Sequence, residues 1–322
     1  MKKFLALLLA LVMVFALAAC GTDDPGNATT DPNAGESTPA ESTNGESLGY
    51  VGISMPTQSL ERWNRDGAFL RDQFEASGYK AELLYANNEV DQQVSDIQNL
   101  IADGVNLLVI SAIDGESLNT VVDEAAENGI PVIAYDRLIM NDNVDYYVSF
   151  DNYSVGVLQG QFLEEQLGLA DRTADDPAYI EFTAGDPADN NAPFFYNGAM
   201  SILQPYLDSG VLVCLSGQTD FDVVATEQWN TDTALDRAQT ILASYYSGGE
   251  HLDAWLCSND STALGVTQAV TSDYTGGNTV IITGQDGDVA NLRNIIDGTQ
   301  AMTVYKAVAN EAAATLDIAA AL

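Results

Sequence analysis

The chain has few basic residues for its acidic content. Its 322 residues include 11 Lys and Arg against 47 Asp and Glu, which gives a formal net charge of −36. A surface this acidic repels phosphate backbones and anionic lipid headgroups, so the composition excludes nucleic-acid binding and a polybasic membrane contact. We interpret most of the charge as a solvated surface that keeps the protein soluble.

Residues that bind metals or carry redox chemistry are equally scarce. The single histidine, His251, follows Gly-Gly-Glu in a predicted surface turn, and the sequence shows no calcium-loop spacing. Of three cysteines, Cys214 and Cys257 lie in apolar runs that predict strands. Buried free thiols are favoured there, although a disulfide is permitted outside the cell. We therefore predict neither a metal nor a cofactor.

Sequence motifs of common enzymes are missing as well. No G-x-G-x-x-G follows the first predicted strand, no phosphate-binding G-x-x-x-x-G-K-[ST] occurs, and no G-x-S-x-G nucleophile motif stands between a predicted strand and a predicted helix. A pair of Asp residues could still be assembled for glycoside hydrolysis, which leaves a glycan-active enzyme as an alternative. We predict that the protein is not an enzyme.

The N-terminus carries an apolar run that ends at a cysteine. Lys2 and Lys3 precede unbroken apolar residues from Phe4 to Ala19, and small residues stand directly before Cys20. The run is shorter than the about 20 residues that span a bilayer, and it resembles a bacterial lipoprotein signal peptide. We predict that residues 1–19 are removed, that Cys20 is lipidated, and that the polar, acidic residues 20–47 form a flexible linker.

Apolar runs and amphipathic stretches alternate from Leu48 onward. This alternation predicts an α/β protein with parallel sheets and right-handed crossovers. Because ten strands are many for one sheet, we predict two Rossmann-like lobes joined by a multi-segment hinge. The first lobe comprises residues 48–152 plus 302–322, and the second comprises 153–301. The predicted strands are 50–55, 81–86, 106–112, 131–137, 145–150, 178–185, 211–217, 252–260, 279–286 and 301–306.

Polar side chains gather at the carboxyl ends of these strands, where two facing parallel sheets share a cleft. Planar carboxylate, amide and guanidinium groups suit vicinal hydroxyls, and aromatic rings suit the apolar face of a pyranose. Each polar residue taken alone has an alternative role as a helix N-cap, and each aromatic has one in the core. The polar candidates include Asp114, Asp136, Arg137, Asp151, Asn152, Asp186, Asp189, Asn190, Asn191, Asn259, Asp260, Gln285 and Asp286.

Several stretches resemble the substrate-binding proteins of sugar ABC importers, particularly the branch that binds xylose and multiple monosaccharides. They include LERWNRDG, AIDGESLNTV, AGDPADNNAPFFYNGAM, CSNDSTALGV and ITGQDGD, and the resemblance extends from about Tyr50 to Asn310. It implies a type I periplasmic-binding-protein fold that closes on a monosaccharide of the xylose, glucose, galactose or arabinose type. The implied partner is an ABC importer permease or, alternatively, a membrane sensor, and the implied state is a monomer.

The resemblance also implies individual ligand-binding residues. Phe194 or Trp229 is the implied stacking partner, and Asp260 has an alternative as an N-cap. Family members usually continue past the equivalent of Leu322 through another crossing segment. The implied ligand-binding residues are Arg62, Trp63, Asp114, Arg137, Asn152, Asn191, Asn259, Asp260, Gln285, Asp286 and Lys306.

We predict that the mature protein attaches to the membrane through Cys20 alone, because the linker after it carries no basic cluster. Replacing Cys20 with Ala should leave the protein unprocessed or release it from membranes. Metabolic labelling with a radioactive lipid precursor measures the modification directly. Unchanged labelling of the Cys20→Ala variant would contradict the prediction.

Overall fold

The computed structural model describes residues 47–322. The predicted signal peptide, the lipidation site Cys20 and nearly all of the predicted linker lie outside the described residues. Within the described part, no helix combines the length and apolar character that crossing a membrane requires.

The first sheet is built from five parallel strands in the order β2-β1-β3-β4-β5. β3 and β4 are apolar and buried along their whole length because helices cover both faces of the sheet. The elements of this part are β1 (Tyr50–Met55), α1 (Glu61–Ala76), β2 (Lys80–Tyr85), α2 (Val90–Ala102), β3 (Leu107–Ile110), α3 (Asn119–Glu127), β4 (Val132–Tyr135) and β5 (Tyr146–Val148).

The second sheet has four parallel strands in the order β7-β6-β8-β9. Its core is formed by apolar residues of β6 and β8 against the helices on either face. The elements are α4 (Asn152–Leu167), η1 (Leu169–Asp171), β6 (Ala178–Thr183), α5 (Ala192–Ser209), β7 (Leu212–Val213), α6 (Phe221–Val224), η2 (Glu227–Trp229), α7 (Thr231–Tyr245), β8 (Ala254–Cys257), α8 (Asp260–Asp273), β9 (Ile281–Ile282) and α9 (Val289–Asp297).

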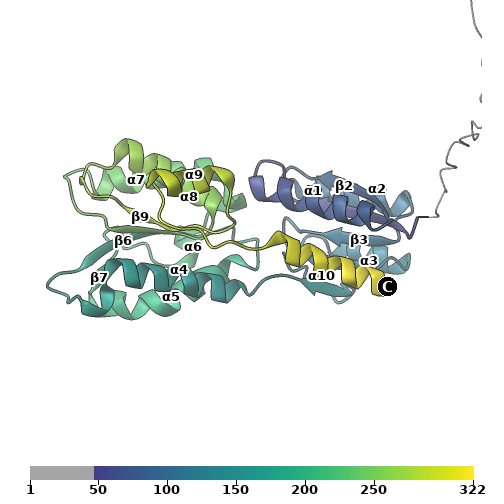
Figure 1. Ribbon diagram of the computed structural model, residues 1–322, viewed down its shortest axis with the longest axis horizontal. Helices are drawn as coiled ribbons and strands as arrows, with labels where there is room; N and C mark the ends of the chain where they lie inside the picture. The colour runs from purple at the N-terminus through teal and green to yellow at the C-terminus, as the bar shows by residue number, and fades with distance from the viewer. Residues whose placement is uncertain (1–46) are drawn as a thin grey trace, which may run out of the picture. The chain divides into compact units, whose positions relative to one another are not determined.

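The last helix, α10 (Val308–Ala321), returns to the first sheet, where it lies beside α1 (Figure 1). Its buried residues Ala312 and Ala319 join the same core cluster as Val51, Leu107 and Ile133. We use "first lobe" for β1–β5, α1–α3 and α10, and "second lobe" for β6–β9 and α4–α9. The residue limits of the predicted lobes stay a prediction.

The predicted class of two parallel α/β sheets is confirmed, but the predicted strand at 301–306 is wrong. Val304 forms a single parallel bridge, with Gln285 of the second lobe. Two residues further along, the Lys306 side chain pairs with Asp136 and Asp286. The predicted strand at 211–217 is also shorter, so the half-buried Cys214 follows β7 and lies 3.4 Å from Glu181. Both Cys214 and the buried Cys257 are free thiols.

Helices α4 and α5 of the second lobe touch backbone to backbone. A Cβ atom on Gly156 would lie 1.9 Å from the carbonyl oxygen of Phe195, and one on Gly198 would lie 2.2 Å from the carbonyl oxygen of Tyr153. Glycine is required at both places, because a backbone neighbour cannot rotate away as a side chain can. This close packing fixes the position of Phe195 at the start of α5.

The change Gly156→Ala should destabilise the fold by about 3 kcal/mol, the upper part of the range for overpacked sites. Gln161→Ala provides the control, because Gln161 lies on the same helix and is exposed. Chemical denaturation of both variants measures the difference. Equal free energies of unfolding for the two variants would show that α4 and α5 can separate at no cost.

Candidate functional site

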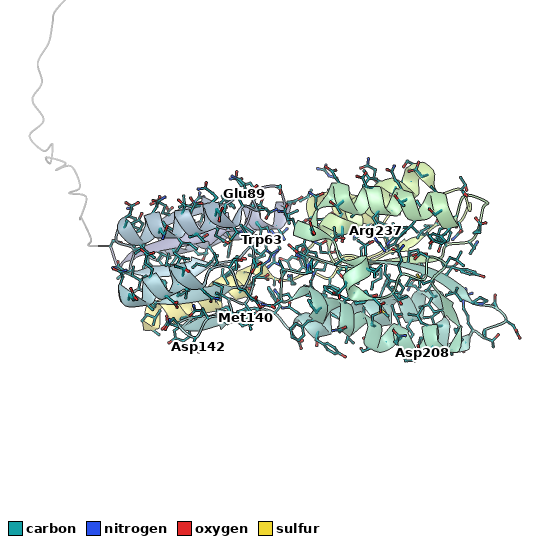
Figure 2. The ribbon with its side chains drawn as sticks, turned by 180° about the vertical axis from the view of Figure 1, so that it is seen from behind. Trp63, Glu89, Met140, Asp142, Asp208 and Arg237 are labelled. Atoms are coloured by element: carbon teal, nitrogen blue, oxygen red, sulfur yellow. The ribbon has the colours of Figure 1, made fainter. Side chains whose placement is uncertain are left out.

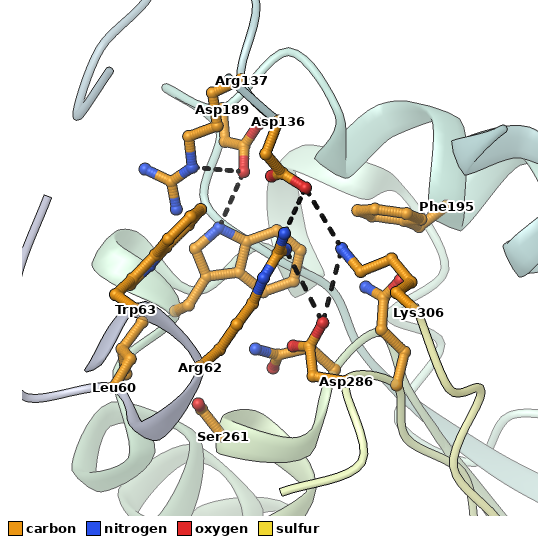
Figure 3. A pocket seen from close by; sticks show the side chains of 13 residues that line it. Leu60, Arg62, Trp63, Asp136, Arg137, Asp189, Phe195, Ser261, Asp286 and Lys306 are labelled. Carbon is orange, nitrogen blue, oxygen red and sulfur yellow. Dashed lines mark hydrogen bonds and ion pairs between the residues drawn. The ribbon is translucent and has the colours of Figure 1, made fainter. Parts of the chain in front are cut away.

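A pocket lies where the strand ends of the two lobes meet. Trp63 lies at this junction, whereas the exposed Asp142 and Asp208 lie away from it (Figure 2). The lining draws on both lobes and on the segment before α10 (Figure 3). It consists of Leu60, Arg62, Trp63, Asp136, Arg137, Asp189, Phe195, Trp229, Asn259, Ser261, Gln285, Asp286 and Lys306.

Two carboxylates, one from each lobe, share the same two cations. Asp136 follows β4 and Asp286 follows β9, and both bind Arg62 and Lys306 (Figure 3). The Lys306 ammonium lies 3.6 Å from Asp136 and 3.4 Å from Asp286, and Arg62 lies 3.7 Å from Asp286. Both Asp residues have a positive φ, 60° and 107°. Such backbone strain concentrates at functional sites, where surrounding contacts hold it in place.

The ion cluster continues beneath the pocket into the first lobe. Arg62 also pairs with Asp66 of α1 at 3.1 Å and with Glu311 of α10 at 3.7 Å. Burial raises the pKa of both of these carboxyls, and neighbouring Asp136 raises that of Glu311 further. Burial would also raise the pKa of Asp136, but Arg62 and Lys306 hold it below its ordinary value. The site therefore combines an ionised carboxylate facing the pocket with carboxyls behind it that favour protonation.

Arg137 joins the lobes on the other side of the pocket. Its Nε lies 3.0 Å from Asp189 of the second lobe, while its Nη1 donates to the carbonyl of Ala112 at 3.0 Å. The same Asp189 carboxylate accepts a hydrogen bond from the indole of Trp229 at 3.2 Å. Arg137 is thereby anchored in the first lobe and paired across the cleft.

Three aromatic rings complete the walls. The centroid of the Trp63 ring lies 4.5 Å from Cζ of Arg62 and 5.1 Å from Cζ of Arg137. Both guanidinium groups thus make cation–π contacts with this ring. Phe195 and Trp229 meet edge to face with their centroids 6.1 Å apart. The close approach of Trp229 requires Gly185, since a Cβ there would lie 2.0 Å from the indole.

Of the two predicted stacking partners, Trp229 lines the pocket and Phe194 does not. Phe194 is 56% exposed, whereas its neighbour Phe195 is 2% exposed and lines the pocket. The one-residue difference follows from helix geometry, because consecutive residues at the start of α5 point about 100° apart. The stretch AGDPADNNAPFFYNGAM places both Phe residues in the first turn of α5, but it does not indicate which of the two rings faces the pocket.

Three predicted polar residues lie near the pocket without lining it. Asp114 accepts hydrogen bonds from the amides of Glu116 and Ser117 and thus shapes its own turn. Asn152 donates to Asn191 at 2.8 Å. Asn191 in turn donates to the carbonyl of Asp136 at 2.9 Å. The two Asn residues support the backbone of a pocket carboxylate from behind.

Asp260 is fully buried inside the second lobe and does not line the pocket. Its carboxylate accepts from the Asp288 amide at 2.9 Å, from Thr303 at 3.0 Å and from Gln300 at 3.1 Å. The N-cap of α8 is its neighbour Asn259, which accepts from the Thr262 amide and also lines the pocket. Asp260 is therefore not the N-cap, and it links the loop before α9 to the segment after α9, while its predicted contact with a ligand stays a prediction.

Other lining residues were missed by the implied binding set. Asp136 and Asp189 are among the polar candidates at the strand ends but not in the implied binding set, Phe195 occurs only within the stretch AGDPADNNAPFFYNGAM, and Leu60 and Ser261 carry no signal of a binding role. Behind the lining, Asp66 lies four residues after Arg62 on α1, a spacing that pairs opposite charges. Glu311 is a lone acid on the buried face of the Ala-rich α10, and such a residue signals a buried cation partner.

The pocket offers free hydrogen-bonding capacity but no metal site. The side-chain oxygens Gln285 Oε1 and Asp286 Oδ1 are buried and have no hydrogen-bond partner among residues 47–322. In the same range, no cluster of three or more His, Cys, Asp or Glu side chains is arranged to hold a metal. Acceptors, cations and aromatic faces together suit a small polyhydroxylated molecule.

Two parallel α/β lobes that share a polar and aromatic pocket define a two-lobed ligand-binding receptor. The chain belongs to the family described as periplasmic binding protein domain, which matches residues 51–322. This is a family of binding receptors rather than of enzymes, and the expected fold and family resemblance are thereby confirmed.

Two relatives of the chain are named as sugar-binding periplasmic proteins. It is 44% identical to the multiple sugar-binding periplasmic receptor ChvE of Rhizobium radiobacter, covering 85% of this chain and 78% of that protein. It is 36% identical to the D-xylose-binding periplasmic protein of Escherichia coli K12, covering 84% and 77%.

Solved structures of similar chains contain bound sugar. An ABC transporter solute-binding protein from Clostridium phytofermentans with bound β-D-glucose is 52% identical, with a TM-score of 0.80, covering 83% of this chain and 82% of that one. A carbohydrate transporter solute-binding protein from Chloroflexus aurantiacus in complex with D-glucose is 32% identical, with a TM-score of 0.74, covering 84% and 83%.

The buried Asp260 should make stability depend on pH. Burial, followed by the nearby Asp286, raises the pKa of the Asp260 carboxyl to about 7. The fold therefore holds a proton that the unfolded chain releases near pH 4, so this contribution is lost as pH rises toward 7. We expect Asp260→Asn to flatten the fall in melting temperature between pH 5 and about 7.

Asp208→Asn is the matched control, because Asp208 is an exposed carboxylate of the same lobe (Figure 2). Thermal melts of both variants and the wild type across the pH range measure the slopes. Parallel curves for Asp260→Asn and the wild type would show that Asp260 is ionised throughout.

Proposed function

We propose that this protein is an extracytoplasmic receptor that binds one monosaccharide between its lobes and delivers it to an ABC-type importer. The observation that carries the proposal is the pocket lining, which takes planar polar groups and aromatic rings from both lobes. A ligand touching both lobes binds the closed form more tightly than the open form and so shifts the population toward it. The closed form then presents the surface that the permease recognises.

The chemistry of the lining favours a neutral sugar. Arg62, Arg137 and Lys306 are each within salt-bridge distance of a carboxylate, so no lining cation is left to neutralise an acidic ligand. Gln285 Oε1 and Asp286 Oδ1 accept no hydrogen bond within residues 47–322, and both can accept from sugar hydroxyls, the second while it is ion-paired with Lys306. Sugars of the glucose and xylose type, which relatives bind, match this description.

The proposed binding residues follow from the lining. Arg62, Trp63, Arg137, Asn259, Gln285, Asp286, Lys306 and Trp229 belong to it, together with Asp136, Asp189, Phe195 and Ser261. Asp114, Asn152, Asn191 and Asp260 act through the backbone that carries these residues. The moving bodies are residues 48–152 with 302–322, and residues 153–301.

Attachment and partners complete the proposal. Lipidation of Cys20 after removal of residues 1–19 holds the monomeric receptor at the outer side of the cytoplasmic membrane, with residues 20–47 as the linker. The protein carries no enzymatic activity of its own. Its acidic surface keeps it away from nucleic acid and from anionic lipid.

The function is tested by thermal shift with D-glucose, D-xylose, D-galactose and L-arabinose, using the open-chain sorbitol as a negative control. A sugar at about 100 times its dissociation constant adds about 2.7 kcal/mol to the stability. Small-angle scattering with the best ligand should show a smaller radius of gyration. No stabilisation by any monosaccharide, or saturated binding with an unchanged radius, would contradict the proposal.

The variant Gln285→Ala should weaken sugar binding by about fivefold to tenfold, because it removes an acceptor that has no partner in the protein. Isothermal titration calorimetry measures the loss. Gln268→Ala on the exposed face of α8 serves as the control and should bind like the wild type. Wild-type affinity of Gln285→Ala would remove this residue from the site.

A further inference from the structure

We propose that Arg65, assisted by Glu61, is a positioning residue that holds the second-lobe loop 286–289 from the first lobe and thereby fixes the carboxylate of Asp286 in the pocket. The inference rests on the proposed function of that pocket. Neither Arg65 nor Glu61 lines the pocket, so any effect on the ligand passes through Asp286.

The contacts run from one face of α1. Glu61 and Arg65 are four residues apart and therefore lie on the same side of the helix. Arg65 Nη2 donates to the carbonyl of Asp286 at 3.0 Å, and its Nη1 lies 3.6 Å from the Asp288 carboxylate. Glu61 accepts a hydrogen bond from the amide of Val289 at 3.0 Å. Three residues of one short loop are thus held by two side chains of the opposite lobe.

The loop requires such support because its backbone is strained. Asp286 has a φ of 107° and the following Gly287 a φ of 70°. A non-glycine residue in this region costs about 1 to 3 kcal/mol and persists where surrounding contacts hold it. Within the second lobe and the segment after it, the amide of Asp286 donates to Val304 and that of Asp288 to Asp260, both at 2.9 Å. Arg65 instead binds the backbone carbonyl of Asp286, on the other side of the same strained residue.

The other strained carboxylate of the pocket is held in the same way. Asp136 has a φ of 60°, and its carbonyl accepts from Asn191 of the second lobe at 2.9 Å. Each of the two carboxylates that share Arg62 and Lys306 therefore has its carbonyl bound by a side chain from the other lobe. The Asp136 carbonyl also accepts from Tyr147 at 3.1 Å and from Ser149 at 2.9 Å, both on its own side of the pocket, so the support from the other lobe matters most for Asp286.

Arg65 also lowers the electrostatic cost of placing Asp288 beside other acidic groups. Burial, followed by Asp286 and Asp260, raises the pKa of the Asp288 carboxyl to about 8, while Arg65 opposes the rise and Glu61 adds to it. The loop thus gathers acidic groups that repel one another. The Arg65 side chain is about one-third exposed, so replacing it opens no cavity in the core.

The test compares Arg65→Ala with Arg71→Ala in the purified protein. Arg71 lies on the same helix but pairs with the exposed Asp72, at 2.7 Å. Titration with D-glucose should show about tenfold weaker binding for Arg65→Ala, the effect of losing a hydrogen bond from a charged group, and no change beyond twofold for Arg71→Ala. Wild-type affinity of Arg65→Ala would overturn the inference.

A double-mutant cycle separates positioning from a general loss of stability. If Arg65 acts through the Asp286 carboxylate, adding Arg65→Ala to Asp286→Ala should weaken binding by less than about twofold. A full tenfold effect in both backgrounds would show that Arg65 acts independently of Asp286 and would overturn the inference.

Hydrogen exchange of the sugar-free protein provides a readout that needs no ligand. Amides of residues 286–289 should exchange faster in Arg65→Ala than in the wild type and in Arg71→Ala, and equal protection would overturn the inference. If the wild type binds none of the sugars but the exchange changes as expected, the proposed function fails while the holding of the loop stands.

Discussion

The guanidinium of Arg62 is the charge on which both lobes converge. It is almost completely buried and contacts carboxylates from α1, from the end of β4, from the end of β9 and from α10. Burying a cation is unfavourable unless partners surround it, and removing one partner of a buried pair costs about 3 to 5 kcal/mol. The arrangement of the strand ends, the last helix and the crossing segment with Lys306 can be understood as the means of surrounding this group.

The need to surround buried cations with carboxylates also explains why a pocket proposed to bind a neutral sugar contains many charged residues. Carboxylates that neutralise Arg62 and Lys306 keep acceptor capacity toward the pocket, and a sugar hydroxyl can donate to them. A carboxylate fixed in advance by ion pairs loses little freedom when the ligand arrives. Rigid polar groups of this kind favour affinity and selectivity between hydroxyl orientations.

Much of the fold and part of the site could be predicted from the sequence. Alternating apolar runs and amphipathic stretches give the two parallel sheets, since β3, β4 and β8 are buried on both faces and are apolar throughout. Short strands were harder to predict, because β7 and β9 pair over only two residues each, and residues 301–306 form a β-bridge only at Val304. There, contacts distant in the sequence decide the backbone.

For the site, local motifs located the turns but not the direction of each side chain. Phe194 and Phe195 are adjacent in sequence and differ in burial because of a helix that begins at Ala192. Asp260 and Asn259 are equally adjacent, yet one ties loops together and the other faces the pocket. Arg65 lies within the stretch LERWNRDG but is not among the implied binding residues, and Glu311 lies in none of the quoted stretches. The partners of both lie more than 200 residues away in the sequence.

The return of α10 to the first lobe also sets an order of assembly. Elements β6 to α9 of the second lobe come from one uninterrupted stretch, whereas the first lobe needs Ala312 and Ala319 to complete the core around Val51 and Ile133. Contacts between segments so far apart form slowly, because a long loop must close before they form. In refolding, the second lobe is therefore expected to become structured first, and the first lobe to mature only when α10 docks.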